Sequence, residues 1–394
     1  MRDLFDDKTG NRAFIDLLRT TGILQVVLFH VIHGIIRFAP QESISGFVER
    51  MPWWMNFAWQ AYGVDTIFVI SAFLLTFSLL LELNNSGSID FRAYYVRRLS
   101  RILPLYYIAL IVFAAAQGNS LPEIITSALF IGYIVGDFNV IPVGWSMEVM
   151  ILYYVALPWI VILLKSIGRP ILWLSLTIIG AALWRYLFII SQPEEPVQLF
   201  LTMLDTKDAS PAGFELYFRP WFRLPAFLMG TIMAYLVLQN RIPKTLITPV
   251  LTIVLIVPLV WLPVQNRNSW AYDLLSPNLW AVYWSIAPVI FARAFGFFIV
   301  WGLLRGREKP WKIHPMFRAF SINIFAVYLF HMPFLAVGAV MVFMTTDPSA
   351  LGSAGPVKVV AVFVITAGLT YLFAWPLTKF VEQPLQRLLR RRFN

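Results

Sequence analysis

Long apolar runs separated by short polar segments dominate the hydropathy pattern of this chain. Most are long enough for a helix to cross the hydrocarbon core of a bilayer, which takes about 20 residues. The pattern therefore predicts an all-α fold, a polytopic integral membrane helix bundle. The runs cover residues 13–36, 57–82, 102–116, 121–136, 145–164, 170–190, 222–239, 246–264, 289–304, 319–344 and 358–380.

The positions of the lysines and arginines decide between ten and eleven spans. If the N-terminus is cytoplasmic and the short 121–136 run is re-entrant or interfacial, most of the 31 basic residues fall in cytoplasmic segments. That distribution fits the positive-inside rule, whereas a full span at 121–136 would place the later basic loops on the wrong side. We therefore expect about ten transmembrane helices with both termini in the cytoplasm.

The composition agrees with a membrane protein, because 59% of the residues are hydrophobic and 13% are charged. Soluble domains hold roughly 45–50% apolar and about 25% charged residues. The net charge of +10 is accounted for by cytoplasmic loops and does not indicate a nucleic-acid partner. The chain has no cysteine, which excludes disulfides, thiol nucleophiles and cysteine metal sites, and we expect no metal.

The domain organisation that we expect is one transmembrane domain over residues 1–394. It has a short cytoplasmic segment at 1–12, a basic cytoplasmic tail at 382–394 and no fused soluble domain. The polar N-terminus lacks the features of a cleavable signal peptide, so the first span acts as an uncleaved anchor. We expect a multi-pass protein of the plasma membrane, the inner membrane of a bacterium. The sequence does not indicate an oligomeric state.

The first span, "LLRTTGILQVVLFHVIHG" (17–34), carries ionisable groups at membrane depth. Eleven residues of helix bring His30 to within about 20° of Arg19, some 16 Å further along. Such groups usually face the protein interior or a water-filled cavity, and Asp16 is an expected ion partner of Arg19. The alternative is that Arg19 extends to the interface and His30 only bridges two helices. We interpret His33 as an interfacial residue.

A second basic cluster lies in "FRAYYVRRLSRILPLYY" (91–107). The spacings i,i+3 and i,i+4 allow Arg97, Arg98 and Arg101 to converge on one helical face. Convergent guanidinium groups suit phosphate, because they are permanently charged and offer paired donors. A cytoplasmic anchor that meets anionic lipid would explain the same arginines equally well.

Two further apolar spans contain isolated polar residues. "GVDTIFVISAFLLT" (63–76) includes Asp65 and Ser71, and "FAVYLFHMPF" (325–334) places His331 near the middle of its span. Polar groups at this depth are candidates for a functional site.

The segment "VGWSMEVMILYY" (143–154) opens a helix at the outer side with Trp145, Ser146 and Glu148. Ser146 and Glu148 are candidates for a catalytic site. A structural interpretation is open as well, in which Ser146 caps the helix and Glu148 is a favourable charge at its N-terminus.

Taken together and in this order, these segments resemble the membrane acyltransferase family 3. The similarity lies in an Arg and a His separated by ten residues in the first helix, "GVD-x-x-F-x-x-S" in the second and "RRLSRILPLYY" after it. The "WS" helix, "YLFH-x-P" and a terminal "E-x-P" complete the set. The resemblance extends from about residue 12 to 390.

The resemblance implies transfer of an acyl group from cytoplasmic acyl-CoA, most commonly acetyl-CoA. The acceptor it implies is a hydroxyl on an extracytoplasmic sugar, polysaccharide or glycolipid. Arg19 and His30 match the functional pair of the family, and Arg98 and Arg101 match the element associated with the donor. We count Arg97 with these donor-binding arginines.

The mechanism that we expect is direct O-acyl transfer, with His30 as general base and Arg19 guiding the donor phosphates. An acyl-enzyme route stays open through Ser71, Ser146 and His331. The alternative function is a transporter or flippase for a lipid-linked sugar, and a third is a scaffold for polysaccharide assembly.

The chain departs from the family pattern at three places. Ser71-Ala72-Phe73 stands where the family usually has "SGF", and Phe325 replaces a tyrosine. Met150 occupies the position of a common family glutamate, and the nearby acid is Glu148, two residues earlier. A shift of two residues turns a side chain by about 200° around the helix axis, so the side chains at positions 148 and 150 point to different faces of the helix.

Overall fold

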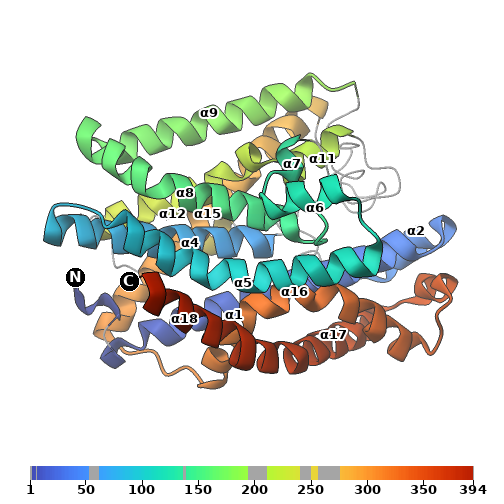
Figure 1. Cartoon of the computed structure of the whole chain (residues 1–394). Coiled ribbons are helices and arrows are strands. Elements are labelled where there is room, and N and C mark those ends of the chain that lie inside the picture. Colours follow the sequence, from blue (N-terminus) through green and yellow to red (C-terminus); the bar gives the residue numbers. More distant parts are fainter. Residues whose placement is uncertain are drawn as a thin grey trace.

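The computed structural model describes residues 2–5, 7–52, 62–135, 139–193, 211–239, 250–255 and 276–393, and these contain no strand. Within these residues, nine helical segments are long and apolar enough to cross a membrane. Two of the nine consist of consecutive helices that continue into one another. The chain is therefore a multi-pass membrane protein built as a helix bundle, as predicted (Figure 1). The one further expected span, at 246–264, lies largely outside the described residues.

The described residues of the bundle form fourteen α-helices. Their bounds are α1 Asn11–Phe38, α2 Gln41–Arg50, α4 Tyr62–Ser86, α5 Phe91–Gln117, α6 Leu121–Ala128, α7 Gly132–Val135, α8 Gly144–Ile167, α9 Pro170–Ile190, α11 Pro211–Phe218, α12 Pro220–Leu238, α15 Pro277–Glu308, α16 Met316–Phe343, α17 Pro356–Leu377 and α18 Gln383–Phe393. A π-helical turn at Thr378–Glu382 joins the last two.

The 121–136 run forms two short helices, α6 and α7, which are too short to cross a bilayer. Ser120 starts α6 with a capping box, in which its backbone N–H donates to the Glu123 carboxylate. The same hydrogen bonds lower the pKa of Glu123. This segment is no span, in agreement with the expected topology.

Two helices begin more than ten residues earlier than the apolar pattern predicts. α5 starts at Phe91 rather than at 102, because the Asp90 side chain caps it by accepting a hydrogen bond from Ala93 N–H. α15 starts at Pro277 rather than at 289, and proline is favoured in the first turn of a helix. At 1.5 Å per residue α15 is about 48 Å long, so it extends beyond the hydrocarbon core.

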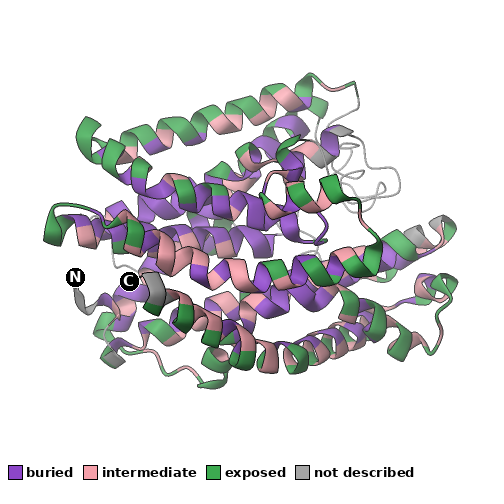
Figure 2. Ribbon diagram, viewed as in Figure 1, coloured by how far each residue is buried: buried purple, intermediate pink, exposed green. Residues whose placement is uncertain are grey.

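The centre of the bundle is α4, which packs against α1, α8, α12 and α15. Glycines allow two of these contacts: a Cβ at Gly63 would lie 2.7 Å from Gly22 O, and one at Gly230 would lie 2.5 Å from Val69 O. Small residues commonly permit such close approach between membrane helices. The interior helices are mostly buried, whereas α9 and α17 expose apolar side chains at the periphery (Figure 2).

The two marked chain ends lie at the same end of the bundle (Figure 1). The basic helix α18 packs there against α5, the helix that carries the arginine cluster. This arrangement agrees with the expectation that both termini face the same compartment.

Candidate functional site

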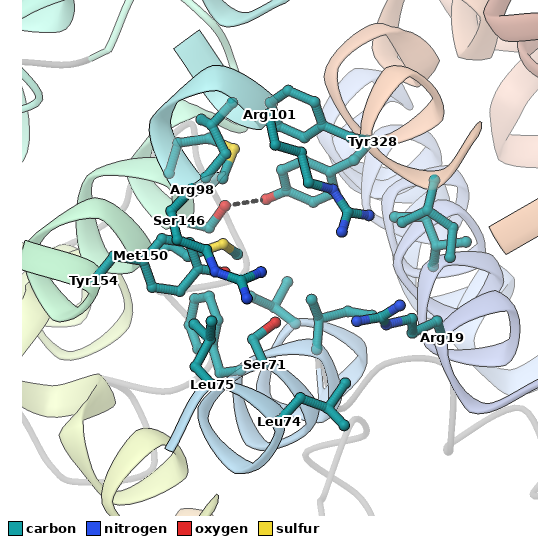
Figure 3. Close-up of a pocket in the computed structure, with 18 of the residues that line it drawn as sticks. Arg19, Ser71, Leu74, Leu75, Arg98, Arg101, Ser146, Met150, Tyr154 and Tyr328 are labelled. Carbon is teal, nitrogen blue, oxygen red and sulfur yellow. Dashed lines mark hydrogen bonds between the residues drawn. The ribbon is translucent and has the colours of Figure 1, made fainter. Parts of the chain in front are cut away.

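A cavity lies in the bundle between α1, α4, α5, α8 and α16. Apolar side chains form much of its wall, and a few polar groups project into it (Figure 3). Binding sites for small molecules commonly have this character, with few polar groups that fix orientation. The polar residues of the lining are Arg19, Ser71, Arg98, Arg101, Ser146, Tyr154, Ser321 and Tyr328.

Three arginines from two helices share this cavity. Arg19 comes from α1, and Arg98 and Arg101 come from successive turns of α5. Among the described residues none of the three forms a salt bridge, and the buried Nε of Arg98 has no hydrogen-bond partner. Guanidinium groups at membrane depth that form no salt bridge indicate a site for an anionic ligand.

One expectation for the arginines is wrong, and another is met only in part. Arg97 does not converge with Arg98 and Arg101, because its guanidinium lies 3.6 Å from the Glu82 carboxylate and outside the cavity lining. Asp16 interacts electrostatically with Arg19 but forms no salt bridge with it; its carboxylate accepts a hydrogen bond from Ser321 Oγ at 2.6 Å.

A second cavity adjoins the first and shares Arg19 and Leu74 with it. The start of α1 and the segment that leads into α16 contribute to its wall, so it lies toward the end of the bundle where the chain ends are marked. Arg12, His314 and Arg318 add positive or titratable groups. Arg19 therefore stands at the junction of a wide outer cavity and the buried one.

Ser146 lies in the wall of the buried cavity and is paired with a tyrosine. Its Oγ is 2.5 Å from the Tyr328 hydroxyl, and both hydroxyls also lie within hydrogen-bond distance of the Val143 carbonyl oxygen. No histidine contacts Ser146 among the described residues. Met150, one turn further along α8, lines the cavity at the position of the common family glutamate.

Glu148 is fully buried but does not line the cavity. One carboxylate oxygen accepts the Tyr133 backbone N–H at 3.0 Å, and the other accepts the Asn139 side-chain amide at 3.1 Å. The same amide donates to the Tyr106 hydroxyl at 3.1 Å. In the structure Glu148 thus ties α8 to the segment before it, and its catalytic role stays a prediction.

His30 and His331 lie beside the end of the cavity and are in direct contact. Nδ1 of His30 is 3.0 Å from Nε2 of His331, and neither ring belongs to the lining. Val26 and Tyr328, one turn before each histidine, do line the cavity. The sequence placed both histidines at membrane depth, but nothing in the spacing indicated that they meet.

Arg223 on α12 is a further buried charge, which the sequence analysis did not single out. Its guanidinium lies 3.1 Å from the Asp65 carboxylate and donates through Nε to the Tyr217 carbonyl oxygen at 2.8 Å. It also lies over the ring of Trp145, 5.1 Å from the centroid. The available signal was an arginine in the first turns of an apolar run. This pair joins α4, α8 and α12 beside the cavity.

Replacing Asp65 by Asn is expected to destabilise the protein by about 3–5 kcal/mol, because Arg223 would remain buried without its counter-ion. Thermal unfolding in detergent should show a clearly lower Tm for Asp65→Asn. The matched control is Glu215→Gln, whose partner Arg219 is partly exposed and should lose at most about 1 kcal/mol. Equal Tm values for wild type and Asp65→Asn would contradict a stabilising role.

The described residues contain no group of three His, Asp or Glu side chains arranged to hold a metal ion. The site is built from arginines, histidines and hydroxyl groups. Such groups can hold an anionic ligand and move a proton, so the arrangement suits transfer chemistry on a phosphate-bearing substrate.

A protein family and several known proteins are similar to this chain. The model of the acyltransferase domain family matches residues 12–378. Provisionally named O-acetyltransferases of Staphylococcus aureus strains COL and N315 are 26% identical to this chain over 294 residues, which is 66% of this chain and 42% of each relative. A provisionally named peptidoglycan O-acetyltransferase of Bacillus subtilis strain 168 is 31% identical over 107 residues, 26% of this chain and 13% of that protein.

The chain spans less than half the length of the Staphylococcus relatives that it matches. No solved structure matches it. The family match covers the helices that build the cavity, with its arginines, and the histidine pair beside it. The chain belongs to the acyltransferase domain family.

Proposed function

We propose that this protein is a membrane O-acyltransferase that moves an acyl group, most simply acetyl, from cytoplasmic acyl-CoA to a hydroxyl of an extracytoplasmic glycan. The observation that carries the proposal is the meeting of three arginines in one cavity, next to a histidine pair, with no salt bridge to any of the three in the described part of the chain. Charged groups in the bilayer interior are costly, so their presence calls for a ligand that compensates them.

The chemical groups of acyl-CoA suit the lining of the two adjoining cavities. The phosphates of coenzyme A would bind guanidinium groups in the outer cavity and at its junction with the buried one. The narrow thioester arm would then extend past Arg19 into the apolar part of the buried cavity. Arg98 and Arg101 would hold the inner phosphate.

The acceptor that we propose is a glycan hydroxyl, which is suggested by the name of the Bacillus relative. His30 lies eleven residues beyond Arg19 on α1, about 16 Å along the helix axis. This separation suits a donor that enters at one face and an acceptor that arrives from the other.

In the proposed reaction Nε2 of His30 removes the proton of the acceptor hydroxyl. The oxygen forms a bond to the thioester carbonyl carbon, and the carbon–sulfur bond breaks as the tetrahedral intermediate collapses. The coenzyme A thiolate leaves and receives the proton from His30. Atoms and charge balance without a further reactant.

The experiment that tests this function uses the purified protein in lipid nanodiscs with [¹⁴C]acetyl-CoA and soluble peptidoglycan fragments. Wild-type protein should release coenzyme A and place label on the fragments. A transporter or flippase for a lipid-linked sugar would instead move its cargo without consuming acetyl-CoA. Failure to consume the donor, with correctly folded protein, would overturn the proposal.

Ser146→Ala is expected to keep acyl transfer within about threefold of wild type. Ser146 contacts a tyrosine rather than a base, and a hydroxyl that has no general base beside it is a weak nucleophile. The measurement is the steady-state rate with acetyl-CoA, together with mass spectrometry of the intact protein after rapid quenching. An acetylated Ser146 in wild type and an inactive variant would instead support an acyl-enzyme.

A further inference from the structure

The hydrogen bonds around the two histidines fix where their protons lie. Nδ1 of His30 is 3.0 Å from the Val26 carbonyl oxygen, and Nδ1 of His331 is 2.8 Å from the Tyr328 carbonyl oxygen. A carbonyl oxygen only accepts hydrogen bonds, so both Nδ1 atoms must carry a proton. A neutral imidazole protonated at Nδ1 has its lone pair on Nε2. The backbone of α1 and of α16 therefore selects one tautomer for each ring.

The contact between the rings follows from these tautomers. Nε2 of His331 bears a lone pair and lies 3.0 Å from Nδ1 of His30, so the Nδ1–H of His30 donates to it and to Val26. Nε2 of His30 then carries the free lone pair, and it makes no hydrogen bond among the described residues. His30 therefore donates a hydrogen bond to His331, and His331 in turn donates one to the Tyr328 carbonyl oxygen.

The hydrogen-bond partner of His30 Nδ1 is thus a neutral imidazole ring, that of His331. In a Ser-His-Asp triad a buried aspartate holds the base in its tautomer and stabilises the imidazolium. Here His331 is fully buried, and no carboxylate forms a salt bridge with either histidine in the described part of the chain. A neutral acceptor can orient the base without the desolvation cost of a buried carboxylate.

We propose that His331 is a positioning residue that presents His30 as a base. It holds the His30 ring through Nδ1, keeps the lone pair on Nε2 and accepts a stronger hydrogen bond when His30 becomes an imidazolium. This inference rests on the proposed function for the reaction that the base serves. The arrangement of the two rings stands on geometry alone.

The kinetic test compares three variants. In His331→Gln the side-chain carbonyl oxygen can take the place of Nε2 and accept from His30, whereas His331→Leu removes the acceptor. Loss of a partner that orients a functional histidine typically costs 10–100-fold. We expect about that loss in kcat for His331→Leu, substantial recovery in His331→Gln and an unchanged KM for acetyl-CoA in both. His33→Gln is the control, since His33 stacks on Phe29 without touching His331.

The spectroscopic test uses ¹⁵N-histidine NMR of the whole protein in nanodiscs. The chain has four histidines, so single substitutions assign every ring. We expect a proton on Nδ1 of His30 and of His331, and a changed His30 Nδ1 signal in His331→Leu but not in His33→Gln. A proton on Nε2 of His30, or equal kcat in His331→Leu and wild type, would overturn the proposal.

The two tests separate this proposal from the proposed function. If wild type consumes no acetyl-CoA while NMR finds the paired tautomers, the function fails and the histidine arrangement holds. If wild type transfers acetyl and His331→Leu does so at the same rate, the function holds and the positioning role fails.

Discussion

His30→Ala is expected to slow acyl transfer by about 10²–10⁴-fold, the usual contribution of a positioned general base. The loss should appear in kcat, with KM for acetyl-CoA nearly unchanged, because His30 lies outside the cavity lining that contains the arginines. The measurement is transfer of label from [¹⁴C]acetyl-CoA to peptidoglycan fragments, at equal amounts of folded protein.

The control for this prediction is His33→Ala on the same helix. His33 stacks on Phe29 with ring centroids 5.6 Å apart and has no bond to His331 among the described residues. It should transfer acetyl at a rate close to wild type. A His30→Ala variant as fast as His33→Ala would exclude His30 as the base.

Arg98→Gln/Arg101→Gln is expected to raise KM for acetyl-CoA strongly. A hydrogen bond to a charged group contributes about 1.5–3 kcal/mol, so each lost arginine should cost roughly 10–100-fold in donor binding. Arg97→Gln should have little effect, because Arg97 lies beside Glu82 and outside the cavity.

A truncated donor identifies what the arginines bind. S-acetyl-pantetheine carries the thioester but no phosphate, so the double variant should use it as well as wild type does. An equal penalty with both donors would show that Arg98 and Arg101 support the structure of the cavity rather than binding phosphate. An unchanged KM for acetyl-CoA would reduce them to determinants of membrane topology.

Much of the fold could be predicted from the sequence, because the bilayer imposes a length and a hydropathy on each span. The limits of α5 and α15 could not, since capping by Asp90 and the proline at 277 act locally and extend helices into polar sequence. That the 121–136 segment does not span the membrane was predicted from the distribution of lysines and arginines among all the loops, because the segment itself does not decide the question.

The site was predictable only where residues share a helix. Spacing brought Arg98 and Arg101 to one face of α5, but it also placed Arg97 there, and the salt bridge to Glu82 could not be foreseen. The contact of His30 with His331 joins positions 301 residues apart, and the pairing of Asp65 with Arg223 joins positions 158 residues apart. Helix packing decides such contacts, and a single sequence does not encode them in any local spacing.

Glu148 shows what helical phase, which can be worked out from the sequence, adds to such a prediction. Its place near the start of α8 made it a candidate acid, but its two oxygens are bound by Tyr133 and Asn139. Met150, which lacks any proton to transfer, occupies the cavity instead. Helical phase separates these two residues by about 200°, so the cavity receives one of them and not the other.

Acyl transfer from one side of the membrane to the other can be tested in sealed proteoliposomes. Soluble peptidoglycan fragments are enclosed inside, and [¹⁴C]acetyl-CoA, which cannot cross the bilayer, is supplied outside. The proposed mechanism predicts labelled fragments inside intact vesicles with wild type, and a rate lower by 10²-fold or more with His30→Ala. Label on the fragments only after the vesicles are opened, so that donor and acceptor share one compartment, would contradict it.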